Sequence, residues 1–362
     1  MSRVVFRDVV KRINVNVDRH NTERLYYVGG EHIDSCELLV TKHGLIEGST
    51  IGFKFHFGFE PGHILFMSRN PHLRKASMAT FSGICSDSTY VVETRDENVL
   101  LQKYLLLEMQ SDRFWEWAEA NKSGGVNYLI NYKTLDTYEF DLPSLAEQKV
   151  LAEKLWAAYE VKQSYLKMIA ATEEMVKSQF IEMFGNIDNP KHETCFLTAI
   201  SENLDSRRVP IKSGNRVQGP YPYYGASGIV DHVSDFIFDE NILLISEDGA
   251  NLKDRTTPIA FSSSGKVWVN NHAHVLRFND DYLQKYVEIY FNLNKIDKYL
   301  TGTAQPKLNQ DKLNCIPIPI PPKMELDKFI SIAHQSDKSI SELRKSVDAI
   351  DKVIKSLINE NL

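Results

Sequence analysis

The sequence has little of what a zinc-stapled or membrane-spanning protein needs. Its four cysteines lie far apart and form no Cys-x-x-Cys pair, which argues against a structural zinc site and for the reducing cytoplasm. The most apolar stretch, residues 99–109, is short and contains three polar or charged residues, so we expect no membrane span. The N-terminus lacks the apolar core of a signal peptide.

An excess of positive charge is also missing. The formal net charge is −6, and every large segment of the chain is neutral or mildly acidic. Because a nucleic-acid binder usually shows a basic footprint, the bulk charge argues weakly against DNA binding. A local basic face, offset by acidic groups elsewhere, stays compatible with it.

Catalytic motifs are absent or incomplete. Residues 262–266 end like a phosphate-binding loop, but Ala260 stands where that loop needs its first glycine. Residues 225–228 have the wrong spacing for a nucleophile elbow and indicate a turn. The sequence contains no Asn-Pro-Pro-Tyr signature of an amino-methyltransferase, so catalysis of that kind would need another chain.

Two pairs of polar residues could suggest chemistry. His272 and His274 lie two apart on a predicted strand, so they share a face and could bind a metal. No acidic or cysteine cluster completes that site, and hydrogen-bonded histidines are favoured. Glu247 and Asp248 could form a catalytic acid pair, but neighbouring side chains on an extended segment point apart, which favours a loop acid.

The most informative feature that is present is an internal duplication. Leu101–Tyr104 returns as Leu283–Tyr286, and residues 124–184 match residues 302–362 without a gap at an offset of 178. The unit is too long for a solenoid repeat. We therefore expect a duplicated globular domain with an attached helix, and a pseudo-twofold molecule.

Apolar spacing predicts a mixed α/β (α+β) fold with two domains and two long helices. We expect globular domain 1 at residues 1–143, spacer helix 1 at 144–185, globular domain 2 at 186–321 and spacer helix 2 at 322–362. The predicted strands of domain 1 are Val4–Phe6, Leu25–Val28, Thr50–Phe57, His63–Met67 and Thr89–Glu93, followed by a helix over Leu100–Glu119. Those of domain 2 are Tyr221–Tyr224, Phe236–Phe238, Ile242–Ile245, Val267–Val269 and His274–Phe278, followed by a helix over Tyr282–Tyr299.

The two long helices have clear boundaries and a common seam. Pro143 precedes the first, Gly185 suits its C-terminal stop, and the alternating prolines of residues 315–322 force an extended segment before the second. At about 1.5 Å per residue each helix is about 55 Å long, enough to space two domains. Heptad spacing predicts an antiparallel coiled coil within the chain. Its expected seam residues are Tyr165, Ile169, Val176, Ile340, Leu343, Val347, Ile350, Ile354 and Leu357.

Candidate nucleic-acid contacts occur in the loop that follows the repeated strand His63–Ser68. With the two copies aligned on a shared leucine, His72 faces Asn251 and Arg74 faces Lys253. Asparagine can read adenine edges, and arginine or lysine can read guanine or hold phosphate. An ordinary solvated loop stays an alternative for each copy.

A second candidate face is the run of cations before the tyrosines of domain 2. Interleaved cations and aromatics suit nucleic acid, although the tyrosines could equally be core and turn residues. The complete set of candidate DNA contacts is Arg69, His72, Arg74, Lys75, Arg207, Arg208, Lys212, Tyr223, Tyr224, Asn251, Lys253 and Arg255.

Four segments carry a family resemblance. Leu142–Lys149 and Ile316–Glu325 resemble a proline-rich start of a helix, and Tyr221–Gly228 and Gly302–Leu308 resemble recurring target-domain segments. Gly124–Ile130, the counterpart in the first domain, departs from that pattern. Together these segments resemble the specificity subunit of a type I restriction-modification system.

The resemblance implies a non-catalytic protein whose two target-recognition domains each read one half of a split double-stranded DNA site. It also implies two copies of a DNA adenine methyltransferase subunit and one restriction or translocase subunit as partners. The chain itself would hold no cofactor, because S-adenosylmethionine would bind to the methyltransferase. Composition alone leaves open a protein-binding adapter and, as a third hypothesis, a metal enzyme built on the two histidines.

Overall fold

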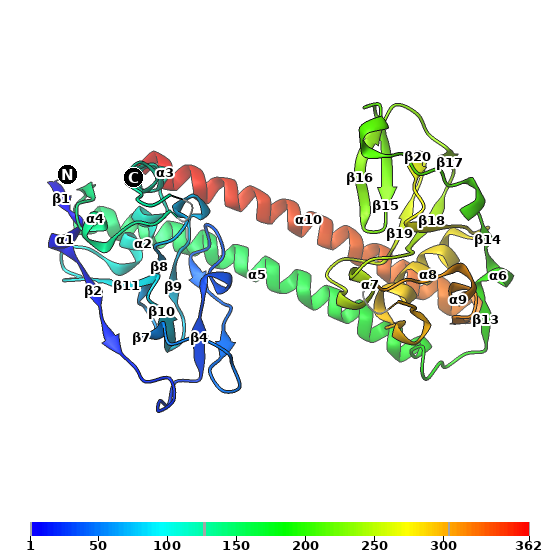
Figure 1. Ribbon diagram of the computed structural model, residues 1–362, viewed down its shortest axis with the longest axis horizontal. Coiled ribbons are helices and arrows are strands. Elements are labelled where there is room, and N and C mark those ends of the chain that lie inside the picture. Colours follow the sequence, from blue (N-terminus) through cyan, green and yellow to red (C-terminus); the bar gives the residue numbers. More distant parts are fainter. Residues whose placement is uncertain (1, 126–127, 303–304, 362) are drawn as a thin grey trace. The chain divides into compact units, whose positions relative to one another are not determined.

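The computed structural model describes residues 2–125, 128–302 and 305–361 (Figure 1). The chain forms two compact units. Unit 1 consists of Met1–Lys167 together with Leu343–Leu362, and unit 2 of Met168–Glu342. Two long helices, α5 (Leu145–Phe184) and α10 (Lys323–Asn361), each contribute to both units. Within the described residues, no helix combines the length and apolar character needed to cross a membrane.

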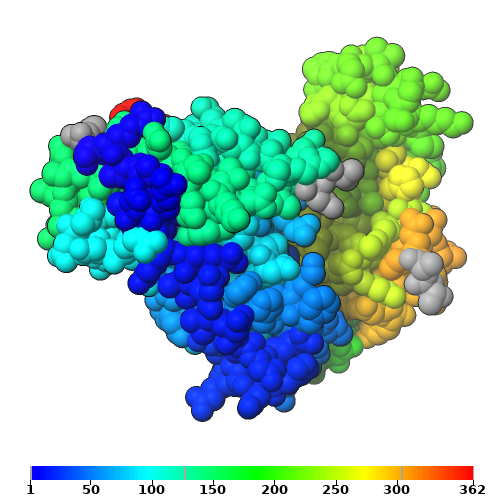
Figure 2. All heavy atoms as spheres, turned by 60° about the vertical axis from the view of Figure 1, so that its left-hand side comes forward, coloured from blue at the N-terminus to red at the C-terminus, as the bar shows by residue number. Residues whose placement is uncertain are grey.

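Unit 1 is built from two five-stranded sheets, a two-stranded sheet and short helices. One sheet has the order β3-β7-β10-β4-β6, the second β2-β11-β8-β9-β5, and β1 pairs with β12. The bounds are β1 Ser2–Val5, β2 Val10–Ile13, β3 Val15–Asn16, β4 Tyr26–Val28, β5 Leu39–Val40, β6 Gly44–Leu45, β7 Phe55–Phe59, β8 Ile64–Met67, β9 Ala76–Ala79, β10 Gly83–Ser86, β11 Thr89–Thr94 and β12 Glu139–Leu142. The helices are α1 Phe6–Val9, α2 Gln102–Gln110, α3 Asp112–Ala120 and α4 Tyr132–Leu135, with 3-10 turns η1 Gly30–His32 and η2 Pro71–Leu73. Figure 2 shows a face of this unit on which the N-terminal segment, in blue, lies beside cyan and green residues of its second half.

Unit 2 has two four-stranded sheets, β14-β21-β18-β19 and β16-β15-β20-β17, and the pair β13-β22. Its strands are β13 Thr194–Phe196, β14 Glu202–Asn203, β15 Tyr221–Gly225, β16 Gly228–Val233, β17 Phe238–Asp239, β18 Ile242–Ser246, β19 Ala260–Ser263, β20 Lys266–Val269, β21 Ala273–Arg277 and β22 Pro317–Pro319. Its helices are α6 Leu197–Ile200, α7 Asn251–Asp254, α8 Asp281–Leu293 and α9 Gln310–Leu313, with 3-10 turns η3 Asp205–Arg207, η4 Ser213–Asn215 and η5 Asp297–Tyr299.

The predicted duplication extends to the strand pairing. The order β2-β11-β8-β9 in unit 1 repeats as β14-β21-β18-β19, and β7-β10-β4-β6 repeats as β17-β20-β15-β16. The pairing senses agree as well, because β10 with β4 and β20 with β15 are the parallel pairs in otherwise antiparallel sets. Unit 1 adds one edge strand to each sheet. The mixed α/β, two-domain fold class is therefore confirmed.

Several expected boundaries are wrong. The helix expected over Leu100–Glu119 is two helices, because Ser111 adopts an extended backbone and its side chain caps α3 by accepting a hydrogen bond from Phe114 N. The helix expected over Tyr282–Tyr299 ends at Leu293, before the turn η5. Gly185 does terminate α5, with φ of +77°.

The long helices pair inside each unit. In unit 1, Trp156 and Tyr159 of α5 share a core with Ile354 and Ile358 of α10. The buried Lys162 ammonium lies 2.8 Å from the Asp351 carboxylate.

In unit 2, Phe180 and Phe184 of α5 pack with Phe329 and Ile330 of α10. Early residues of each helix therefore meet late residues of the other, as an antiparallel pair requires. The expected seam residues are all buried or half-buried. The segments 124–130 and 302–308 each contain two residues, 126–127 and 303–304, that lie outside the described residues.

Candidate functional site

The candidate site in each unit is formed by two neighbouring loops. Turn loop 1 (residues 69–75) follows β8, and turn loop 2 (residues 247–255) follows β18. Beside each turn loop runs a second loop, glycine loop 1 (residues 123–130) or glycine loop 2 (residues 301–308). Equivalent β-bridges join them, Arg69 to Leu129 in unit 1 and Asp248 to Lys307 in unit 2.

Both turn loops contain a short helical turn closed by an arginine with a left-handed backbone. Arg74 ends the turn η2 with φ of +49°, and Arg255 ends α7 with φ of +52°. Such a conformation is uncommon for a residue other than glycine, and its occurrence in both units identifies equivalent positions. The structure therefore aligns Arg74 with Arg255 and His72 with Lys253, in place of the expected pairing of Arg74 with Lys253.

The two arginines hold their loops against the rest of the fold. The Arg255 guanidinium donates to Leu252 O at 3.1 Å, Phe291 O at 2.9 Å and Asn294 O at 2.8 Å, so it caps the C-terminal end of α8. The Arg74 guanidinium forms an ion pair with Asp112, the first residue of α3. Both side chains are thus already engaged within the protein.

Two other predicted contacts also have internal roles. The Lys75 ammonium donates to Gly30 O at 2.6 Å. The Asn251 amide donates to Thr257 O at 3.0 Å and accepts from Thr257 N at 3.0 Å, which closes turn loop 2 on itself.

Three predicted side chains of the turn loops remain exposed. The side chains of Arg69, His72 and Lys253 have no hydrogen bond or ion pair to another group within residues 2–125, 128–302 and 305–361. Each turn loop therefore presents a cation or an imidazole to solvent on a backbone that is fixed by its arginine.

The basic stretch of unit 2 separates into paired and unpaired cations. Arg207 donates to Glu240 at 2.7 Å, and Arg208 donates to Glu247 at 2.6 Å and is 14% exposed at its side chain. Tyr223 is buried beneath the Arg216 guanidinium, 4.4 Å from its ring centroid. Tyr224 stacks on Phe261. These two tyrosines belong to the core, whereas Lys212 is exposed and unpaired in the described part of the chain.

A pocket of about 340 Å³ adjoins Lys212. It is lined by Pro210, Ile211, Lys212, Arg216, Tyr223, Asn270, Asn271 and His272. Asn271 lies at the turn between β20 and β21, is exposed, and its amide has no partner among the described residues. Asn271 is not among the residues predicted from the sequence, although an Asn-Asn pair directly after a predicted strand was the available signal.

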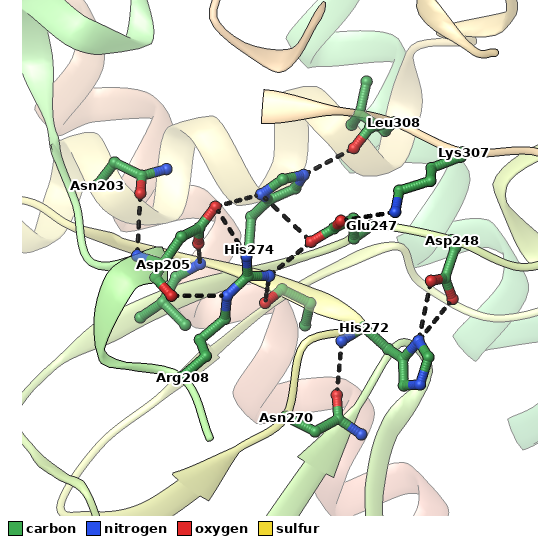
Figure 3. Close-up of polar contacts among 12 residues, drawn as sticks. Asn203, Asp205, Arg208, Glu247, Asp248, Asn270, His272, His274, Lys307 and Leu308 are labelled. Carbon is green, nitrogen blue, oxygen red and sulfur yellow. Dashed lines mark hydrogen bonds and ion pairs between the residues drawn. The ribbon is translucent and has the colours of Figure 1, made fainter. Parts of the chain in front are cut away.

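A buried charge network supports the loops of unit 2 (Figure 3). His274, 1% exposed at its side chain, contacts Asp205 Oδ2 at 2.6 Å and Leu308 O at 2.7 Å. Glu247 lies 2.6 Å from Arg208 and 3.1 Å from Lys307. The network therefore joins turn loop 2 to glycine loop 2.

The electrostatics of this network favour charged carboxylates. Burial acts to raise the pKa of Asp205, but the hydrogen bond and charge of His274 outweigh it and hold the pKa below its usual value. For Glu247, the hydrogen bond from Arg208 and the nearby His274 and Lys307 likewise outweigh burial and lower the pKa.

The two histidines that could have formed a metal site have different surroundings. His274 is enclosed in the network, whereas His272 precedes β21 and lies 2.9 Å from the Asp248 carboxylate (Figure 3). They do not share a face, contrary to the expectation for one strand. No group of three or more metal-ligating side chains occurs in the described parts of the chain.

Comparison with known proteins finds a family match in the second half of the chain and curated relatives of part of it. Residues 192–360 match the family model for the type I restriction modification DNA specificity domain. A putative type I restriction enzyme specificity subunit of Haemophilus influenzae is 34% identical over 137 residues, which are 38% of this chain and 35% of that protein. The EcoDI specificity subunit of Escherichia coli is 25% identical over 148 residues, 41% of this chain and 32% of that protein. The matched regions thus span about a third of these curated relatives.

Solved structures share the fold over the whole chain. The S subunit of a type I restriction-modification system from M. genitalium aligns with 99% of this chain and 94% of its own, with a TM-score of 0.59 and 14% identity. A chain from a structure on complex assembly and conformational transition of the type I R-M system aligns with 99% and 96%, with a TM-score of 0.56 and 16% identity. Specificity subunits are the non-catalytic members of their systems. Residues 192–360 thus match the DNA specificity domain of type I restriction-modification systems, and the two-unit fold is shared with solved chains from such systems.

Proposed function

We propose that this chain is the DNA-reading subunit of a type I restriction-modification complex, with each unit reading one half of a split site. The observation that carries the proposal is the repeated turn loop, which is fixed by a left-handed arginine. It exposes His72 in unit 1 or Lys253 in unit 2, each without a side-chain partner among the described residues. Two copies of one scaffold with different exposed side chains suit two different half-sites.

The exposed groups divide by chemistry. Arg69, Lys212 and Lys253 suit phosphate oxygens or guanine edges, because they are cations whose side chains have no partner among the described residues. The free amide of Asn271 suits an adenine edge. Arg74 and Arg255, whose side chains bind groups of the protein, contribute to DNA reading indirectly, by fixing the backbone of the turn loop.

The long helices supply the spacing between half-sites and the surface for partners. The gap-free match of residues 124–184 to 302–362 gives each unit similar helix ends, which suits two copies of one methyltransferase subunit. S-adenosylmethionine binds to those subunits, and a restriction or translocase subunit joins the complex. Four free thiols suit action in the cytoplasm.

Selection from a randomised duplex DNA library tests this function. The purified chain, alone and with a type I methyltransferase subunit, is expected to retain sequences with two conserved blocks around an unconserved spacer. Retention should fall steeply with salt, because phosphate contacts release counterions. If no sequence is enriched and retention does not depend on salt, DNA reading is refuted and the protein-binding adapter is the better description.

A further inference from the structure

A polar relay connects the end of a long helix to the turn loop in each unit. Its three members are the left-handed arginine of the turn loop, a residue just after the helix that follows the sheets (α2 or α8), and a residue near or just after the C-terminal end of a long helix. The same order of members occurs in both units, although the atoms differ.

In unit 1 the relay ends on α10. The Arg74 guanidinium pairs with the Asp112 carboxylate. Asp112 is in turn held at two points by Asn359, because Asp112 N donates to Asn359 Oδ1 at 2.8 Å and Asn359 Nδ2 donates to Asp112 Oδ2 at 2.7 Å. Figure 1 shows the C-terminal end of α10 beside α3. Residues far apart in the sequence thus meet at one carboxylate.

In unit 2 the relay ends just after α5. The Arg255 guanidinium donates to Asn294 O at 2.8 Å, and Ile187 N donates to Asn294 Oδ1 at 2.8 Å. Asn294 is 5% exposed and Ile187 8% exposed, so this connection is shielded from water. The Asn294 amide also donates to Tyr290 O at 2.9 Å, which holds its orientation.

The middle members occupy equivalent positions. The offset that takes Leu101–Tyr104 to Leu283–Tyr286 also takes Asp112 to Asn294. The sequence changes from carboxylate to amide at this position, yet it contacts the turn-loop arginine and a long-helix end in both units. The contact between this position and the turn-loop arginine therefore recurs in both units, although different atoms make it.

We propose that these relays position the turn loops for DNA reading, so that Asn359, near the C-terminal end of α10, controls discrimination at the half-site read by unit 1. The inference rests on the proposed function. It assigns Arg74, Asp112 and Asn359 as positioning residues of one half-site, and Arg255 and Asn294 as those of the other. A shift of a helix end, for example when a partner binds there, moves the adjoining turn loop through hydrogen bonds of fixed length.

The test uses Asn359→Ala in the full chain, with selection from the randomised duplex library. Asn359 is exposed and close to the end of a helix, so the variant should keep the wild-type melting temperature. We expect its discrimination between bases to fall about three- to tenfold at the half-site that His72→Ala also affects, with the other half-site unchanged. Asn361→Ala is the matched control, because within the described residues that amide donates to Leu357 O of its own helix, at 2.8 Å, and to nothing else.

Exchanging the side chains of Asp112 and Asn359 shows whether Asn359 acts through its contact with Asp112 or whether any loss of an amide lowers discrimination. Asn359→Asp alone places two carboxylates together and should lower discrimination as Asn359→Ala does. Adding Asp112→Asn restores one amide and one carboxylate, and most of the discrimination should return. In unit 2, Arg255→Lys keeps the charge but cannot reach two carbonyls, and should affect the opposite half-site.

Three results would overturn the relay while leaving the proposed function intact. The first is unchanged base discrimination in Asn359→Ala, and the second is an equal loss of discrimination at both half-sites. The third is a double variant, Asn359→Asp with Asp112→Asn, that folds but does not regain discrimination. A wild-type chain that selects no split sequence is a different outcome, since it refutes the proposed function itself and the relay with it.

Discussion

Lys162 of α5 is a buried cation that joins the N-terminal part of unit 1 to both long helices within that unit. Its ammonium lies 2.6 Å from Glu37 of the N-terminal part and 2.8 Å from Asp351 of α10. Tyr159 also donates to Glu37, at 3.0 Å. Burial acts to lower the pKa of Lys162, but the two carboxylates outweigh it and raise the pKa, so the side chain is charged at neutral pH. Lys162→Met therefore removes a charge on which three elements converge.

The expected cost follows from what the substitution leaves behind. Removing one member of a fully buried ion pair costs about 3–5 kcal/mol, because the remaining charge has no partner. Here Glu37 and Asp351 are 28% and 48% exposed at their side chains, so water compensates them in part. We expect Lys162→Met to lower the free energy of unfolding by about 2–3 kcal/mol. For a unit of this size that corresponds to a fall of about 5–10 °C in melting temperature.

Differential scanning calorimetry of the full chain measures this effect. Lys167→Met is the matched control, because Lys167 lies on the same helix, is exposed and has no partner in the described residues. Hydrogen exchange assigns the loss to a unit, and protection should fall in β5 and the C-terminal end of α10. If Lys162→Met melts at the same temperature as Lys167→Met, or above it, the ion pairs do not hold the N-terminal part of unit 1 to the helices.

Four further predictions concern unit 2 and the spacer. Arg255→Ala should destabilise unit 2 by about 2–4 kcal/mol in calorimetry, since it removes a charged donor from three carbonyls. Lys253→Ala should leave the melting temperature unchanged and weaken DNA retention, and the reverse pattern would refute the division between tied and free cations. In the folded protein the pKa values of Asp205 and Glu247 lie below the ordinary values of 3.8 and 4.5. Both carboxylates therefore stabilise the fold at any pH above these ordinary values, and this stabilisation is lost as the pH falls through their pKa values in the folded protein. Acid unfolding followed by tryptophan fluorescence should be less steep in Asp205→Asn, and an unchanged pH profile would contradict this. Deleting one heptad between Ser339 and Ser356 should change the spacing of the selected half-sites or abolish selection, whereas unchanged spacing in a folded protein would refute the spacer role.

The sequence predicted the large features because periodicity and repetition determine them. The repeated Leu-Gln-Lys-Tyr and the heptad positions revealed the two domains and the long helices, whose residues are buried as expected. Gly185 marked a helix end because a left-handed cap there favours glycine. Strands such as β9 (Ala76–Ala79) and β19 (Ala260–Ser263) were missed, because small residues carry a weak strand preference.

The site could be predicted only in part, since side-chain type does not reveal which partners a side chain finds in the fold. Arg74, Arg208 and Arg255 look like free cations in the sequence but are held by Asp112, Glu247 and backbone carbonyls. Lys212 and Lys253 remain free because no carboxylate lies within reach in the described residues. The left-handed arginines that align the two turn loops have no sequence signature.

The composition of unit 1 from two distant segments has a consequence for the order of folding. Unit 2 is contiguous, Met168–Glu342, whereas unit 1 needs Leu343–Leu362 in addition to Met1–Lys167. During synthesis from the N-terminus, unit 2 can therefore complete its core before unit 1, although most of unit 1 leaves the ribosome first. The α5 surface that contacts Ile354 and Ile358 in the folded protein stays exposed until residues 343–362 are synthesised. During this interval unit 1 is most susceptible to aggregation and most accessible to a chaperone.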